Sequence, residues 1–198
     1  RLQGDWSSDV CSSDLAAAGV QPDQVTDVLI SHSHGDHVVG LVNASGGLTF
    51  PNATIRMAAA EWEFLKANAQ MGALVTTITP KVQTFEPGAA ALTPSISSVA
   101  INGHTPGHMG YEIRSGTDSL LYIGDTMHHS VISVQRPEWQ IAFDNDAPTA
   151  TASRAALLER AAAGNLRVYA VHFPFPGLGR FQRRDDGFVW VPEAAARP

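Results

Sequence analysis

The sequence predicts one α+β domain, and two observations support this fold class. Short apolar runs rich in β-branched residues are interspersed with helical patterns, and polar side chains recur where a predicted strand ends. A chain of 198 residues suits one domain, and its 44% of hydrophobic residues is enough to build a core. No internal repeat or linker divides residues 16–198, which we expect to form the folded domain.

The individual elements are predicted from apolar periodicity and from residues that stop helices. Strands are expected at residues 25–30, 54–57, 82–85, 96–101, 111–114, 120–123, 168–171 and 188–191. Of these, 111–114 and 120–123 form a hairpin around a Ser-Gly-Thr-Asp turn. Helices are expected at 58–70 and 148–163, the second with Pro148 in its first turn and Gly164 as its stop.

Residues 1–15 look foreign to this domain. They lack a starting Met, contain a twofold Ser-Ser-Asp repeat and follow no helix or strand period. The stretch is similar to a translated sequencing adapter, and a disordered native terminus is the alternative. We therefore expect a non-native or disordered leader before residues 16–198, with the natural protein beginning further upstream.

Charge and hydropathy exclude some partners. The net charge is −6 without a basic stripe, which argues against a nucleic-acid binder. The cluster of Arg180, Arg183 and Arg184 is expected to be a solvated surface loop. No apolar run approaches the ~20 residues of a membrane-spanning helix, and the single Cys11 allows no internal disulfide. We expect a soluble protein, cytoplasmic or periplasmic, without a membrane partner.

All eight histidines lie in or beside four short segments, namely residues 32–37, 104–108, 128–129 and 172. Each segment follows a predicted strand or lies in a Gly/Pro-rich turn, where a rigid scaffold can aim side chains into a shared cleft. Histidines with ordinary surface or core roles would be scattered. The distribution therefore predicts a metal site assembled from distant stretches of the chain.

The first segment, His-Ser-His-Gly-Asp-His, offers two sets of ligands. In extended backbone, His32 and His34 point to the same side and can hold one metal. Gly35 allows a sharp turn, after which Asp36 and His37 face a second position. Imidazole and carboxylate suit zinc, and also iron, manganese or cobalt. A polar loop with satisfied histidines is the structural alternative.

The remaining segments offer fewer ligands each. In Gly-His-Thr-Pro-Gly-His we expect His104 to be a ligand and His108 to support the structure or lie at the surface. Asp125 lies at the end of a predicted strand. We expect it to bridge two metals, with an ordinary turn residue as the alternative. His172 follows the strand at 168–171 and would mean little in isolation.

In this order, the four motifs resemble the set that marks the metallo-β-lactamase superfamily, over residues 16 to about 192. Residues 131–179 are most similar to its methyl parathion hydrolase and N-acyl-homoserine lactonase branch. The similarity lies in Val134-Gln135, Phe143-Asp144-Asn145-Asp146, the helix that contains Arg154, and His172-Phe173-Pro174-Phe175-Pro176-Gly177. The resemblance implies an αββα four-layer sandwich, of which the N-terminal strands are missing here.

The resemblance also implies two Zn²⁺ ions, with iron, manganese or cobalt as alternatives. The implied ligands are His32, His34 and His104 for one metal, Asp36, His37 and His172 for the other, and Asp125 between them. The chain departs from the pattern at His128, because lactonases of this type often carry a substrate-orienting Tyr three residues after the bridging Asp.

The implied activity is hydrolysis of a lactone, ester or organophosphate by a metal-bridging hydroxide. Asp36 would shuttle a proton to the leaving group, and His128 or His129 would donate a hydrogen bond to the substrate. An apolar pocket wall is expected from Trp139, Phe143, Phe173 and Phe175, with core packing as the alternative. The partner would be a small molecule, and a homodimer is left open.

Three other interpretations remain open. The first is a hydrolase of another branch, a thioesterase like glyoxalase II or a true β-lactamase. The second is a mononuclear iron oxidoreductase, against which the complete ligand set of Asp36, His37 and His172 argues. The third is an inactive fragment, because a sheet without its N-terminal strands exposes an unpaired edge.

Overall fold

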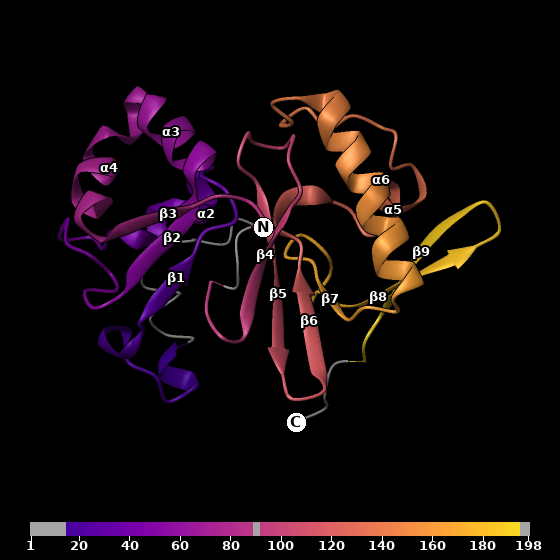
Figure 1. The fold of residues 1–198 in the computed structure, drawn as a ribbon, viewed down its shortest axis with the longest axis horizontal. Coiled ribbons are helices and arrows are strands. Elements are labelled where there is room, and N and C mark those ends of the chain that lie inside the picture. Colours follow the sequence, from indigo (N-terminus) through magenta and orange to yellow (C-terminus); the bar gives the residue numbers. More distant parts are fainter. Residues whose placement is uncertain (1–14, 89–91, 195–198) are drawn as a thin grey trace. The chain divides into compact units, whose positions relative to one another are not determined.

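The structure, a computed structural model, describes residues 15–88 and 92–194. The expectation of a foreign leader falls on residues of which all but Leu15 lie outside the described ranges. The chain divides into two compact units between Glu86 and Pro87. Each unit has its own sheet and its own apolar core (Figure 1). The predicted mixture of strands and helices is confirmed.

Unit 1 contains a three-stranded parallel sheet with helices in its crossovers. Its strands are β1 (Asp27–Leu29), β2 (Thr54–Ala58) and β3 (Val82–Phe85), in that order. Before β1 lies η1 (Pro22–Gln24), and between β1 and β2 lie α2 (Gly35–Val38) and η2 (Val39–Leu41). Between β2 and β3 lie α3 (Ala59–Ala67), η3 (Ala69–Met71), α4 (Gly72–Ile78) and η4 (Thr79–Lys81).

The core of unit 1 fixes the point where the first histidine motif starts. Ile55 and Met57 are two residues apart on β2 and therefore share a face. They are buried in one cluster with Leu65 of α3 and Ile78 of α4. Ile30 belongs to the same cluster, and its N–H donates to the carbonyl of Arg56. The backbone entering the motif is thus held by both packing and the sheet.

Unit 2 contains a six-stranded mixed sheet whose strands lie in chain order. They are β4 (Ile96–Ala100), β5 (Met109–Ser115), β6 (Asp118–Tyr122), β7 (Val168–Tyr169), β8 (Leu178–Arg184) and β9 (Gly187–Pro192). Only β6 and β7 pair in parallel, through a crossover that contains η5 (Gly124–Thr126), α5 (Ile132–Gln135) and α6 (Ala147–Ala163). Because they are parallel, their carboxyl ends meet at one edge, where Asp125 and His172 follow.

Helices α5 and α6 supply the apolar partner of this sheet. Helix α6 packs against β8 and α5 against β9 (Figure 1). Leu157 and Leu158 of α6 are buried in one cluster with Leu121, Val168 and Phe181 of the strands. Burial of each large apolar side chain contributes roughly 1.5–3 kcal/mol. This packing anchors the strands whose carboxyl ends carry polar side chains.

All eight predicted strands and both predicted helices are present, although β7 ends at Tyr169, two residues early. The expectation of a solvated loop at Arg180, Arg183 and Arg184 is wrong, because these residues lie in β8. Arg180 lies between the buried Gly179 and Phe181, which is the alternation of a strand, whereas Arg183 and Arg184 are exposed at the end of β8. Helices α2, α4 and α5 were also not predicted.

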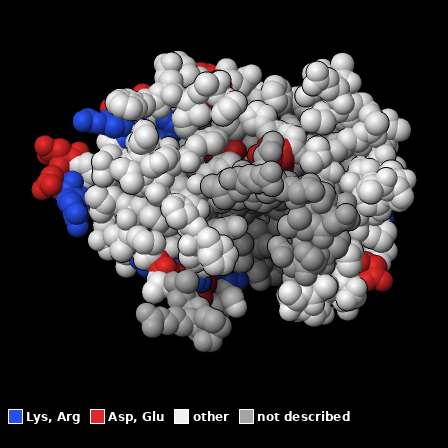
Figure 2. Space-filling view, turned by 180° about the vertical axis from the view of Figure 1, so that it is seen from behind, with Lys and Arg blue, Asp and Glu red and all other residues white. Residues whose placement is uncertain are grey.

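Charge and hydropathy of the described residues add two facts. On the face drawn in Figure 2, their Lys, Arg, Asp and Glu side chains form small separate groups among uncharged ones. None of the helices in the described ranges combines the length and apolar character needed to span a bilayer.

Candidate metal centre

In unit 1, the first motif gathers four side chains with metal-ligating atoms. His34 is extended (φ −63°, ψ 153°) and α2 begins at Gly35, so the predicted turn is the start of a helix. The rings of His32 and His34 lie 4.9 Å apart and each offers a nitrogen within 4.8 Å of the other. Within α2, Asp36 Oδ2 lies 3.5 Å from His37 Nε2. The motif thus presents a His–His pair followed by an Asp–His pair.

A buried glutamate from α3 fixes the middle of this motif. Both the backbone N–H and the hydroxyl of Ser33 donate to Glu61 Oε1, each at 2.6 Å. Glu61 is 1% exposed, and a buried carboxyl group is tolerated only when it is hydrogen-bonded. The residue between His32 and His34 is therefore clamped, which orients both imidazoles. The sequence analysis missed this role.

In unit 2, three imidazoles converge on one carboxylate oxygen. Asp125 Oδ2 lies 2.9 Å from the Nε2 atom of His172, 3.4 Å from that of His128 and 3.7 Å from that of His104. The last two distances exceed ordinary hydrogen-bond lengths. Two atoms bound to one tetrahedral zinc at about 2.0–2.1 Å would lie roughly 3.3–3.4 Å apart. The geometry and the donor types therefore fit a divalent cation.

His104 is placed by a loop that docks on the start of α6. The carbonyl of Gly103 accepts the N–H of Asp146, and the carbonyl of His104 accepts that of Asn145. The ring nitrogen Nδ1 of His104 lies 3.0 Å from Asp144 Oδ1. Burial raises the pKa of Asp144, but its hydrogen bond with His104 and the charge of Arg154 outweigh burial and hold that pKa below its usual value.

His108 supports the site from beneath. Its Nδ1 lies 2.9 Å from the carbonyl oxygen of Ile101, and its Nε2 lies 3.0 Å from the backbone nitrogen of Asp125. Because a carbonyl only accepts, Nδ1 carries the proton and Nε2 accepts the N–H of Asp125. His108 thereby holds the backbone of Asp125, as its predicted supporting role requires.

His128 and His129 are neighbours with different surroundings. The His128 ring stacks on that of His172, with centroids 4.7 Å apart and planes 19° apart. By contrast, Nδ1 of His129 accepts the backbone N–H groups of Val131 and Ile132. Of these two candidates, His128 lies beside the Asp125 carboxylate, whereas one nitrogen of His129 is used to start α5.

Comparison with known proteins places this chain in a family. Residues 3–172 match the family model described as the metallo-beta-lactamase superfamily. The chain belongs to this superfamily. Among curated proteins, none matches it significantly.

Solved structures of the superfamily agree with this assignment. AidC, a dizinc quorum-quenching lactonase in complex with a product, is 30% identical, with a TM-score of 0.86 over 94% of this chain and 70% of its own. The hydrolase AbOPH is 29% identical, with a TM-score of 0.83 over 94% of this chain and 70% of its own. The fold is also shared by a probable metal-dependent hydrolase from Staphylococcus aureus. It is 21% identical, with a TM-score of 0.74 over 93% of this chain and 69% of its own.

Membership of the superfamily confirms two predictions. The chain has the metallo-β-lactamase fold, and its relation to lactonases and hydrolases of that fold supports a metal-dependent hydrolase of the lactonase-like branch. The His and Asp side chains gathered in each unit indicate a site for a divalent metal, which in this superfamily is typically zinc.

The aromatic residues expected in the substrate pocket separate into two groups. Trp139, Phe143 and Phe175 are exposed by 58%, 71% and 94%, and the Phe143 ring lies 6.4 Å from that of His128. Phe173 is 5% exposed and packs edge-on against Trp190 in the core. Its environment matches the packing alternative, so we leave Phe173 out of the proposed pocket.

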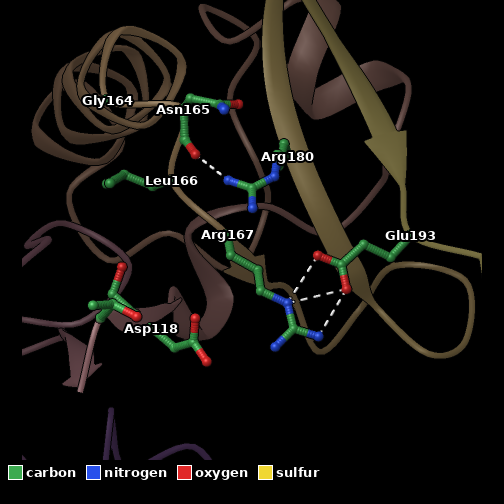
Figure 3. A pocket seen from close by; sticks show the side chains of 9 residues that line it. Asp118, Gly164, Asn165, Leu166, Arg167, Arg180 and Glu193 are labelled. Atoms are coloured by element: carbon green, nitrogen blue, oxygen red, sulfur yellow. Dashed lines mark hydrogen bonds and ion pairs between the residues drawn. The ribbon is translucent and has the colours of Figure 1, made fainter. Parts of the chain in front are cut away.

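Figure 3 shows a charged pocket of unit 2 whose lining includes Asp118, Arg167, Arg180 and Glu193. Its cavity of about 400 Å³ is lined by Asp118 and Arg167, which stand at or before the beginning of β6 and β7. Asp125 and His172 follow the opposite ends of these strands. Arg167 is paired with Glu193, and Arg180 donates to the carbonyl of Asn165. Both arginines of the pocket are thus hydrogen-bonded within it, and neither forms part of the metal centre.

Proposed function

We propose that this chain is a dinuclear-metal hydrolase that opens lactones and also cleaves carboxylic esters or organophosphate triesters. The observation that carries the proposal is the convergence of three imidazole nitrogens on the oxygen of Asp125. The complete His-x-His-x-Asp-His motif of unit 1 supports a second metal position. The similarity to a dizinc lactonase supports a lactone as the preferred substrate.

The proposed ligand sets draw on both units. We assign His32, His34 and His104 to one cation, Asp36, His37 and His172 to the other, and Asp125 to both. Support comes from the separations within each unit, where His32 and His34, Asp36 and His37, and Asp125 and His172 each offer ligand atoms within 4.8 Å of each other. Zn²⁺ suits these imidazole and carboxylate donors, with iron, manganese or cobalt as alternatives.

When bound, two such cations lower the pKa of a water molecule and polarise a carbonyl or phosphoryl oxygen. Hydrolysis then joins the oxygen of water to the electrophilic centre and breaks the bond to the leaving oxygen, which needs a proton. Asp36, whose side chain is 50% exposed, would carry that proton. His128, held against the ring of His172, would donate a hydrogen bond to the substrate.

Phe143 beside His128, together with two further exposed aromatic residues, suggests what the substrate carries besides its reacting group. The ring of Phe143 lies 6.4 Å from that of His128, tilted by 40°, and Trp139 and Phe175 are exposed. Exposed aromatic side chains beside polar groups are typical of a surface that binds an apolar substituent. We therefore expect lactones with an acyl chain to be hydrolysed faster than lactones without one.

Metal analysis and a substrate panel test the proposal together. We expect about two equivalents of zinc per chain, and loss of metal and activity in the double variant His32→Ala/His34→Ala. The panel contains an acyl-homoserine lactone, a paraoxon-type triester, a thioester and nitrocefin. Fastest turnover of the thioester or of nitrocefin would assign the chain to the glyoxalase II-like or β-lactamase alternative. An iron-only site with oxygen consumption would indicate an oxidoreductase.

A further inference from the structure

A buried arginine of α6 lies next to the loop that carries the ligand His104. Arg154 is 1% exposed. Its Nε donates to the carbonyl of Thr126 at 2.8 Å, and its Nη1 donates to those of Pro137 and Trp139 at 2.9 and 3.0 Å. Its Nη2 donates to Asp144 Oδ2 at 3.1 Å. A buried charge is tolerated only when it is hydrogen-bonded and paired, and Arg154 meets both conditions.

Asp144 connects this arginine to His104. Its other oxygen, Oδ1, lies 3.0 Å from His104 Nδ1, and both side chains are almost fully buried. A carboxylate only accepts hydrogen bonds, so Nδ1 of His104 carries a proton and donates it to Asp144. The remaining nitrogen, Nε2, is the one that faces Asp125. An imidazole binds a metal through its unprotonated nitrogen, and the partner of its other nitrogen fixes the tautomer.

We propose that Asp144 and Arg154 are positioning residues of the metal centre. Asp144 holds His104 in the tautomer and rotation that present Nε2, and Arg154 holds Asp144. This inference rests on the proposed function in that it takes His104 as a metal ligand. It adds two residues that belong to neither ligand set.

Only an arginine can make this set of contacts. Its planar fork reaches three carbonyls and one carboxylate at once, whereas a lysine ammonium has three donors at a single point. One of those carbonyls belongs to Thr126, directly after Asp125. Arg154 therefore supports the backbone of one proposed ligand and, through Asp144, the side chain of another.

The same pair also fixes the segment that presents two exposed aromatic residues. Arg154 holds the carbonyl of Trp139, and Asp144 directly follows Phe143. Because the contacts to His104 and to this segment share one guanidinium, we infer that disturbing Asp144 disturbs both. Asp144 and Arg154, to which the sequence analysis assigned no role, thereby acquire one.

Asp144→Asn is the decisive variant, with Glu112→Gln as the matched control. An amide accepts hydrogen bonds at one end only, so the side chain of this variant cannot serve the N–H groups of both His104 and Arg154. Glu112 also pairs with an arginine of α6, Arg160 at 2.9 Å, but does not touch His104. We expect Asp144→Asn to weaken zinc binding, measured against a competing chelator, about 10–100-fold. Glu112→Gln should bind zinc like the parent protein.

A second readout needs no metal. In the metal-free protein, ¹⁵N spectra of the histidine rings should find a proton on Nδ1 of His104, and its Nε2 tautomer should gain population only in Asp144→Asn. If this variant does not fold, Asp144→Ser, which leaves room for a water between His104 and Arg154, carries the same measurements.

The two readouts distinguish the possible failures. Unchanged zinc affinity together with an unchanged tautomer in a folded Asp144 variant overturns the positioning role and leaves the proposed function intact. A parent protein that binds no zinc overturns the proposed function, while the metal-free spectra still decide whether Asp144 orients His104.

Discussion

At the scale of single residues, the carboxylate of Asp125 organises unit 2. Its backbone N–H is held by His108, while its Oδ2 faces the Nε2 atoms of three other histidines. One oxygen cannot hydrogen-bond well to three imidazoles, and two of the separations are too long for it. Cations bound to Asp125, His104 and His172 account for this convergence better than hydrogen bonds do, which is why we interpret the cluster as a metal centre.

His128 stands at the position where the sequence resemblance to lactonases implies a Tyr, and its proposed role is testable. We expect His128→Phe to retain zinc and to lower kcat about 10²-fold, because a hydrogen-bond donor to the substrate is lost. His128→Tyr, which restores a donor, should retain more activity. Zinc content and kcat are measured on the same samples. A Phe variant with lower zinc content would show that His128 is a ligand, and one with unchanged kcat would exclude both roles.

Asp27 tests the electrostatics of unit 1 away from the metal centre. A hydrogen bond from Arg56 lowers the pKa of Asp27 although burial opposes it, with help from Thr26. A lowered pKa contributes stability above the unfolded value of about 3.9, and this contribution is lost as the pH falls further. Asp27→Asn should therefore cost up to about 1 kcal/mol at pH 7 and nothing measurable near pH 2.

Urea unfolding at the two pH values measures this difference. Glu63→Gln is the control, because its ion pair with Lys66 is much more exposed. An Asp27→Asn effect that is as large near pH 2 as at pH 7 would contradict the ion pair as its cause.

At the scale of elements, the contact between the His104 loop and α6 depends on one glycine. Gly103 has φ +118°, and a β-carbon there would overlap the backbone nitrogen and α-carbon of Ala150. Gly103→Ala combines a left-handed backbone with overpacking and should cost about 2–4 kcal/mol. It should also weaken zinc binding, because the loop that carries His104 is displaced.

Gly116→Ala isolates the backbone part of this effect. Gly116 also has a positive φ (+59°), but a β-carbon there would meet nothing within 4 Å. Thermal unfolding and zinc titration of both variants separate strain from clash. If Gly116→Ala loses as much stability and zinc affinity as Gly103→Ala, the close approach to α6 is not what makes Gly103 necessary.

The elements that were predicted differ physically from those that were missed. The predicted strands are short apolar runs, whose packing is decided locally. Helix α4 was missed because its sequence begins with Gly72 and contains β-branched residues such as Val75 and Ile78, which are poor helix formers. Burial of Ile78 in the core offsets that preference. Strand β8 was missed because its charged residues outnumber its one large buried apolar residue, Phe181, so the sequence shows no alternating apolar pattern. Hydrogen-bonded pairing with both neighbouring strands stabilises β8.

The same distinction applies to the site. Proposed ligands such as His32 and His34 are visible in the sequence because their spacing suits metal binding. The residues that orient them come from distant elements and look ordinary there: Glu61 in α3 contacts Ser33, 28 positions away, and Arg154 in α6 contacts Thr126, also 28 positions away. No periodicity connects such pairs, so only the folded chain identifies them.

At the scale of the whole molecule, the ligand motifs are divided between two units that each have a core. Residues 32–37 follow the core of unit 1, and His104, Asp125 and His172 belong to unit 2. If the proposed ligand sets are right, each cation takes ligands from both units. Unfolding of either unit then releases the metals, so metal binding contributes to the stability of both.

Removal of the metals tests this coupling. A ligand that binds only the native state stabilises it by about 4 kcal/mol at a free concentration 1,000 times its Kd. We therefore expect zinc to raise the unfolding midpoints of both units, and EDTA to lower both. Fluorine-labelled tryptophan reports on each unit, because Trp62 packs against the core of unit 1 and Trp190 against that of unit 2. In the His32→Ala/His34→Ala variant the zinc effect on Trp62 should shrink. A zinc effect confined to Trp190 in the parent protein would mean that residues 32–37 supply no ligand, because a metal that takes ligands from unit 1 stabilises the native state of unit 1.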